Sequence, residues 1–173
     1  IAVGAALFAS RENDSLPRRP SSESPQPRLQ LASEDAPIRI IDAIVVNRGS
    51  SDARIELCVG DLTTLQPADE VDVLVVSAFP NDYTPLPGSL IGSLARKGVH
   101  VGELARRKEV DLRQSFSCWM SPRLLNPPRG IHFGRILCFE PYVRGTPADL
   151  VGDIFRSLSP FVGESPPIRT VAT

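Results

Sequence analysis

The stretch Val71-Asp72-Val73-Leu74-Val75-Val76-Ser77-Ala78-Phe79 (71–79) is apolar at almost every position and shows little polar alternation. A strand that is apolar on both faces is typical of a parallel or mixed sheet buried between two layers. A loop with three prolines follows (79–88), and Ser89–Lys97 then has the pattern of a helix. Ser89 is suited to cap the start of this helix, and Gly98 to end it. The pattern predicts a central strand that leads into a helix.

The same alternation of strands and helices continues on both sides of this stretch. Thr146 and Pro147 are favoured residues at the start of a helix, and Asp149 is favoured in its first turn. Strands that alternate with helices predict an α/β fold, in which a layered mixed sheet is flanked by helices. Ligands of such folds bind beyond the carboxyl ends of the strands. The further expected strands are Ile38–Val46, Arg54–Val59, Ser115–Met120, Ile131–Phe139 and Ile168–Ala172, and the further helices are Val101–Arg107 and Thr146–Leu158.

Composition divides the chain into a leader and one domain. Residues 10–37 are rich in Pro and Ser and poor in large apolar side chains, which predicts a disordered leader or linker over 1–37. The remaining residues, 38–173, are expected to form one α/β domain. The apolar run Ile1–Ala9 is too short to span a bilayer, so no membrane partner is expected. With 19 basic and 20 acidic side chains, the chain lacks the basic excess of a nucleic-acid-binding protein.

The three cysteines, Cys58, Cys118 and Cys138, each lie in an apolar run, and their number is odd. Their spacing does not match that of a zinc site, so no metal is expected. We expect three free thiols and therefore a reducing, cytoplasmic location.

Two loops that follow predicted strands carry polar groups suited to a ligand. In Gly60–Thr63, Asp61 offers a carboxylate for an amine or a sugar hydroxyl, and the alternative is that Asp61 caps the following turn. In the loop from Ser77 to Gly88, Asn81, Asp82, Tyr83 and the adjoining Ser89 could line a site before a helix N-terminus. The alternative is that this loop is stiffened by its prolines and has only a structural role.

The stretch IELCVGDLTTLQPADEVDVLVVSAF (55–79) resembles the opening of a macro domain, a family of ADP-ribose-binding modules. Gly60–Thr63 matches the family's Gly-Asp-Ile-Thr motif, and Val71–Ala78 matches the strand motif that follows. The resemblance implies a macro-like fold in which Asp61 binds the adenine amine. Val76 and Phe79 stand where the family has asparagines, and the family's second phosphate loop does not follow the last strand, which implies a C-terminally incomplete domain.

The function implied is a binding module for ADP-ribose, a related nucleotide or an ADP-ribosylated protein, within a larger multidomain protein that has protein partners. One alternative is a protein-interaction scaffold that keeps the fold and has lost ligand binding, and a third is an ADP-ribosyl hydrolase. Catalysis depends on oriented polar groups, and the altered loops favour binding over hydrolysis, so we expect no catalytic residue and no cofactor. The expected ligand-binding residues are Asp61, Leu62, Ser77, Asn81, Asp82 and Ser89.

Overall fold

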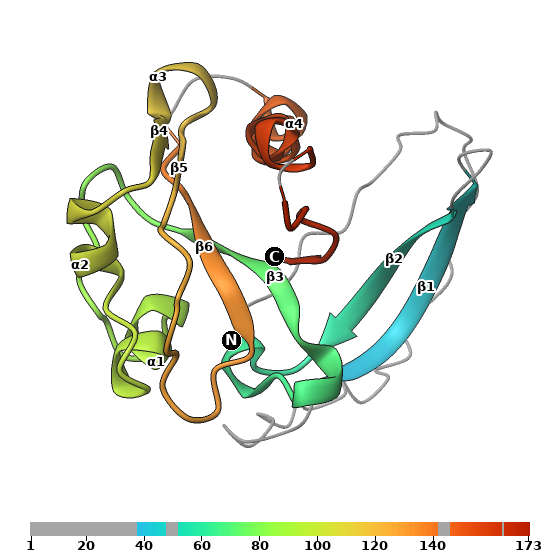
Figure 1. Cartoon of the computed structure of the whole chain (residues 1–173), viewed down its shortest axis with the longest axis horizontal. Helices are drawn as coiled ribbons and strands as arrows, with labels where there is room; N and C mark the ends of the chain where they lie inside the picture. The colour runs from blue at the N-terminus through green and yellow to red at the C-terminus, as the bar shows by residue number, and fades with distance from the viewer. Residues whose placement is uncertain (1–37, 48–51, 142–145, 164) are drawn as a thin grey trace, which may run out of the picture.

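The computed structural model describes residues 38–47, 52–141, 146–163 and 165–173, so the leader predicted over 1–37 lies outside the described residues. Within these ranges the strands form two separate sheets, one of five strands and one of two. Figure 1 shows the five-stranded sheet with helices on both sides, and the two-stranded ribbon standing apart from it. The predicted α/β class with a mixed sheet and flanking helices is confirmed.

The five-stranded sheet has the strand order β4-β5-β6-β3-β7, with β3 inside it. Strand β3 runs parallel to both of its neighbours, β6 and β7, whereas β5 is antiparallel to β6 and β4 is antiparallel to β5. The sheet is therefore mixed. Its strands are β3 (Val71–Ser77), β4 (Val110–Leu112), β5 (Cys118–Met120), β6 (Phe133–Phe139) and β7 (Val171–Ala172).

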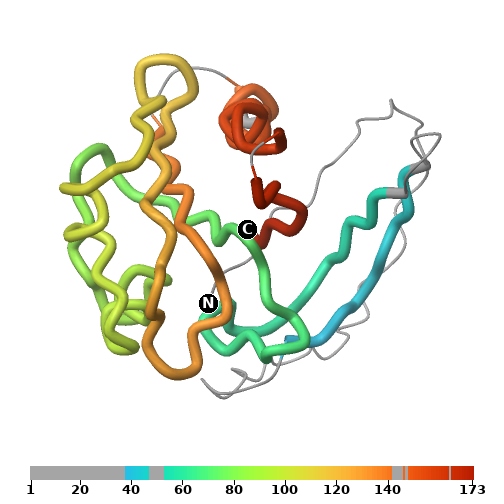
Figure 2. The backbone as a smooth tube through the Cα atoms, in the orientation of Figure 1, coloured from blue at the N-terminus to red at the C-terminus, as the bar shows by residue number. Residues whose placement is uncertain are grey.

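The two faces of β3 belong to two hydrophobic cores. Leu74 and Val76 pack in a cluster that includes residues of α1 (Leu90–Arg96) and α2 (Val101–Arg106). Val73 and Val75 pack on the opposite face, with residues of α4 (Pro147–Leu158). The tube in Figure 2 follows this layering of helix, sheet and helix. Both faces of β3 are buried, as its apolar sequence predicts.

Side-chain caps begin α1 and α4 where the sequence predicts them. The Ser89 hydroxyl accepts a hydrogen bond from the Gly92 N–H at 2.9 Å and begins α1. Gly98, with φ +83°, follows the end of this helix in the left-handed conformation that suits glycine. At α4, Thr146 and Asp149 form a reciprocal capping box.

The segment before β5 differs from the predicted strand over Ser115–Met120. Only Cys118–Met120 is a strand, and Arg113–Phe116 forms the short helix α3, which ends at Ser117 with φ 53°. The Asp111 carboxylate accepts the Arg113 N–H at 3.2 Å, and such a local bond favours a turn over continued pairing. Three short 3-10 turns, Leu62–Thr64 (η1), Pro67–Asp69 (η2) and Ser159–Phe161 (η3), complete the elements.

The last predicted strand, Ile168–Ala172, is shorter than expected, and only Val171–Ala172 pairs with β3. Asp72 binds the two residues that precede β7. Its Oδ2 atom accepts the N–H groups of Arg169 at 2.8 Å and Thr170 at 2.9 Å, and the Thr170 hydroxyl at 3.0 Å. Burial alone would raise the pKa of Asp72, but these hydrogen bonds outweigh it and lower the pKa. An ionised Asp72 therefore helps to hold β7 in the sheet.

Strands β1 (Arg39–Asn47) and β2 (Asp52–Val59) form an antiparallel ribbon of their own, with Ile44 opposite Ile55 and a register shift between Ile40 and Asp42. Directly opposed residues project on the same face of a sheet. One face of this ribbon therefore carries a set of exposed large apolar side chains, which we call the apolar ribbon face: Ile44, Val46, Ile55, Leu57 and Val59.

Cys118 and Cys138 lie on neighbouring strands but belong to opposite cores, and Cys58 lies on the ribbon. All three are free thiols, as predicted. Among the described residues, no helix is both long enough and apolar enough to cross a membrane.

Candidate functional site

The carboxyl ends of the parallel strands β3 and β6 lie side by side. Ser77 at the end of β3 is level with Phe139 at the end of β6, and the Ala78 N–H bonds to the Phe139 carbonyl at 3.0 Å. The loop that leads to Ser89 therefore starts beside Glu140, the residue that follows β6. This edge is where α/β sheets place ligands.

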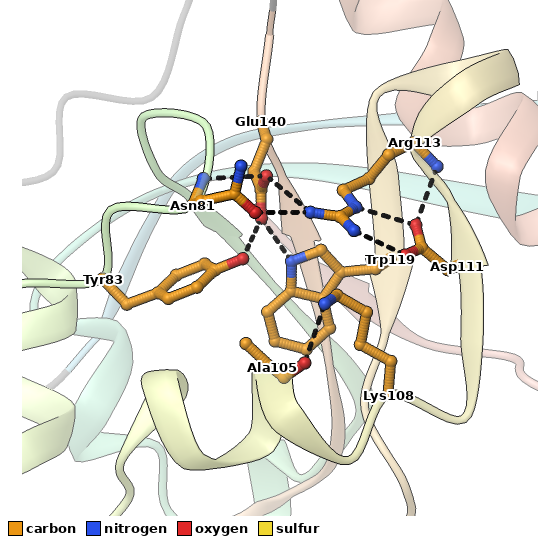
Figure 3. A network of polar contacts seen from close by, with 8 residues as sticks. All are labelled: Asn81, Tyr83, Ala105, Lys108, Asp111, Arg113, Trp119 and Glu140. Carbon is orange, nitrogen blue, oxygen red and sulfur yellow. Dashed lines mark hydrogen bonds and ion pairs between the residues drawn. The ribbon is translucent and has the colours of Figure 1, made fainter.

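A buried carboxylate organises this edge. The Glu140 side chain is 1% exposed, and its Oε1 atom accepts the Tyr83 hydroxyl and, at 2.5 Å, the Trp119 indole N–H. Its Oε2 atom accepts the Asn81 backbone N–H at 3.2 Å and lies 3.6 Å from Arg113 Nη1 (Figure 3). Four groups from three separate segments thus converge on one carboxylate, which meets the requirement that a buried charge be paired and hydrogen-bonded.

Arg113 links this buried carboxylate to a more exposed one. Its Nε and Nη2 atoms donate to the two oxygens of Asp111 at 2.8 and 2.7 Å, a bidentate pair. Its Nη1 atom donates to the Asn81 side-chain oxygen at 2.7 Å. The hydrogen bonds from Arg113 lower the pKa of Asp111, and the same pair raises the pKa of Arg113. Both groups are therefore charged at neutral pH.

Two aromatic rings complete the network. The Tyr83 and Trp119 rings meet edge to face with centroids 5.8 Å apart, and Lys108 Nζ lies 5.5 Å from the centroid of the Trp119 ring. Lys108 is held there because it also donates to the Ala105 carbonyl at 2.8 Å. Burial, together with the hydrogen bond to Glu140, raises the pKa of Tyr83, so its hydroxyl remains a donor.

Beyond this network the edge presents groups to solvent. The Phe79 side chain is 80% exposed, and the Phe79 carbonyl accepts the Asp82 N–H at 2.9 Å in a tight turn where Asn81 has φ 59°. The Asp82 Oδ1 atom accepts the hydroxyl and the N–H of Thr84 at 2.6 and 3.0 Å, which lowers the pKa of Asp82. An exposed aromatic ring and an ionised carboxylate therefore follow the exposed Ser77 within five residues of the chain.

The structure divides the six predicted ligand-binding residues into separate groups. Ser77, Asn81 and Asp82 lie together at the carboxyl edge. Asp61 caps η1, because its Oδ1 atom accepts the N–H and the hydroxyl of Thr63, both at 2.8 Å. This is the capping role considered for Asp61 from the sequence.

The other two predicted residues have structural contacts of their own. These residues are Ser89 and Leu62. The helix that Ser89 begins ends beside η1, because Lys97, the C-cap of α1, donates to the Thr63 carbonyl. Ser89 is engaged twice, because it donates to the Leu86 carbonyl at 2.7 Å and accepts the Gly92 N–H. Leu62 packs against the core that contains Leu74.

The sequence indicated Tyr83 as a residue that could line a site in its loop, but it did not single out Glu140, Arg113 or Trp119. One signal was present at Glu140, because a carboxylate directly follows the apolar run Ile136–Phe139. Its partners are 21 to 59 residues away along the chain, so their convergence is visible only in three dimensions. Among the described residues, no group of three or more His, Cys, Asp or Glu side chains could hold a metal ion.

In comparisons with known proteins, no protein-family model, curated protein or solved structure matches this chain.

Proposed function

We propose that the chain binds ADP-ribose or a related nucleotide, free or attached to a protein, at the carboxyl edge of β3 and β6. The observation that carries the proposal is Phe79, whose ring is 80% exposed at the carboxyl end of a central parallel strand. Stacking of a base on an exposed aromatic ring stabilises binding by about 1–3 kcal/mol. The resemblance of 55–79 to macro domains supports the same class of ligand.

Polar groups around Phe79 suit the sugars of such a ligand. Ser77 offers an exposed hydroxyl, and both hydrogen bonds from Thr84 end on Asp82 Oδ1, so Oδ2 is the oxygen that faces a ribose hydroxyl. Asp61 has the same arrangement, because both bonds from Thr63 end on Oδ1. Asp61 lies with η1 beside the C-terminal end of α1, so its Oδ2 atom is an alternative position for the adenine amine, separate from Phe79.

The Glu140 network supports this function by holding the loop. It fixes Asn81 through its backbone and Tyr83 through its hydroxyl, two and four residues after Phe79. A loop held in place before the ligand arrives loses less conformational entropy on binding.

Calorimetric titration of ADP-ribose into the chain tests the proposal. We expect Phe79→Ala to weaken binding by about 1–3 kcal/mol, or roughly five- to a hundredfold. The matched control is Phe155→Ala on α4, which removes another exposed phenyl ring (59% exposed) and should leave the affinity unchanged. Asp61→Ala should cost about 1.5–3 kcal/mol of affinity if this carboxylate holds the adenine amine.

Equal affinities of wild type and Phe79→Ala for ADP-ribose would show that the base does not stack on Phe79. An affinity unaffected by Asp61→Ala would show that Asp61 does not contact the adenine amine. Absence of binding by the wild type would favour a second candidate, a protein-interaction scaffold. A specific observation supports that candidate, namely the apolar ribbon face, because contiguous exposed apolar surface marks interaction sites.

A further inference from the structure

A concave region lies away from Glu140. It is an open cleft of about 450 Å³ between α2 and the loop that joins β5 to β6. The loop enters β6 at its amino end, where the Leu124 N–H bonds to the Gly134 carbonyl at 2.9 Å. Glu140 is six residues further along, which is about 20 Å in an extended strand. The cleft is thus separate from the carboxyl edge.

The walls of the cleft are apolar. Val99 and Leu104 are buried, at 4% and 7% exposure, and line it on the helix side. Pro122, Leu124 and Pro128 line it on the loop side. A wall of this kind favours the apolar body of a ligand.

The charged groups of the cleft are mainly basic. Arg107 and Arg123 both line it and are exposed, and in the part of the chain that the structure describes neither side chain forms a hydrogen bond or an ion pair. Arg123 lies close enough to Asp72 to contribute to the lowered pKa of that carboxyl, but Asp72 does not line the cleft. Glu103 is the carboxylate on the same lining, and His100 adds an imidazole. Two guanidinium groups against one carboxylate favour an anion, since Arg binds phosphate and carboxylate through paired N–H groups.

We propose that this cleft binds a small organic anion, with a phosphate or carboxylate group held by Arg107 and Arg123 and an apolar body against Leu104 and Leu124. The volume suits such a ligand, because small-molecule sites span about 300–1,000 Å³. This site is independent of the nucleotide site proposed at β3 and β6.

An NMR titration of the ¹⁵N-labelled chain with phenyl phosphate tests the proposal, and benzoate is the carboxylate probe. We expect saturable shifts of the Gly98, Val99 and Leu124 amides with either anion. Benzyl alcohol, which has no charge, and inorganic phosphate, which has no apolar body, should bind more weakly. Shifts confined to Ser77–Asp82 would report the other edge of the sheet and would count against this cleft.

Substitutions then separate the site from general charge attraction. Arg107→Ala and Arg123→Ala should each weaken phenyl phosphate binding about tenfold, the loss expected for a charge-assisted hydrogen bond. Arg106→Ala and Arg129→Ala are the matched controls, because these exposed neighbours do not line the cleft. The proposal is overturned if the amides of the cleft show no saturable shift up to about 10 mM ligand, if benzyl alcohol or inorganic phosphate binds as tightly as phenyl phosphate, or if the control variants lose as much affinity.

Discussion

Replacing Glu140 with glutamine keeps the shape of the side chain and removes its charge. Trp119 Nε1–H can only donate, so the amide oxygen of the glutamine must take the place of Oε1. The amide NH₂ then faces the Asn81 N–H and Arg113, where Oε2 accepted before. Tyr83 and Trp119 keep an acceptor, but a neutral one, which forms weaker hydrogen bonds than a carboxylate.

The expected loss of stability follows from these contacts. A buried N–H that loses its acceptor costs about 1–3 kcal/mol, and breaking a buried ion pair costs about 3–5 kcal/mol. Arg113 keeps its bonds to Asp111 and to the Asn81 side chain, so the loss of its ion pair with Glu140 contributes little to the loss of stability. We expect Glu140→Gln to lower the free energy of unfolding by about 3 kcal/mol. Glu103→Gln, at an exposed glutamate of α2, should change it by no more than about 0.5 kcal/mol.

Urea unfolding measures this difference. Trp119 is the only tryptophan in the sequence, so its fluorescence follows the buried core, and circular dichroism gives a midpoint independent of the indole environment. With a slope of about 1–3 kcal/mol per molar urea, a loss of 3 kcal/mol lowers the midpoint by about 1–3 M. Equal midpoints for Glu140→Gln and Glu103→Gln would show that the carboxylate does not hold the loop in place.

Other predictions concern the core, the thiols and the sheet edge. Leu74→Ala should cost about 2–5 kcal/mol in urea unfolding because Leu74 is fully buried, whereas Leu125→Ala, at an 82% exposed side chain, should cost little; equal effects would contradict the layering. Burial raises the pKa of the Cys118 thiol to about 11, so mass spectrometry after alkylation should find Cys58 modified first and Cys118 only on unfolding. Because the folded pKa of Asp72 is lowered, its stabilising effect is present above the ordinary pKa of about 3.9 and is lost as the pH falls through the folded value. Asp72→Asn should therefore lower stability at pH 7 and reduce the loss between about pH 4 and pH 2, and unchanged acid sensitivity would exclude this carboxylate as a source.

The sequence predicted those strands and helices whose formation depends on residues close together in the chain. The apolar run of β3 indicates burial on both faces, and the caps at Ser89 and Thr146 mark where α1 and α4 begin. The apolar and β-branched residues of β1 and β2 indicate strands, but they do not specify the sheet to which a strand belongs. The sequence pattern therefore could not predict that β1 and β2 form a separate sheet.

The candidate site was predicted only in part, for a related reason. Ser77 ends β3 and Asp82 lies in the loop that follows it, so the preference of ligands for the carboxyl ends of strands predicts both positions. Glu140 and Arg113 come from other segments, and an isolated Glu or Arg in a sequence is usually a surface residue. At Asp61, capping of η1 and a ligand contact require the same residue type, so the sequence alone could not separate them.

The convergence on Glu140 also bears on the order of folding. Its hydrogen bonds to Asn81, Tyr83 and Trp119 close chain separations of 59, 57 and 21 residues. The entropy of closing such loops must be lost before the carboxylate meets its donors, and a carboxylate that leaves water without them is strongly disfavoured. We therefore expect the network to assemble after the rate-limiting barrier, once β3 and β6 have paired. Substitutions at Glu140 should then act mainly by accelerating unfolding, so that this cluster sets how long the native protein persists more than how fast it forms.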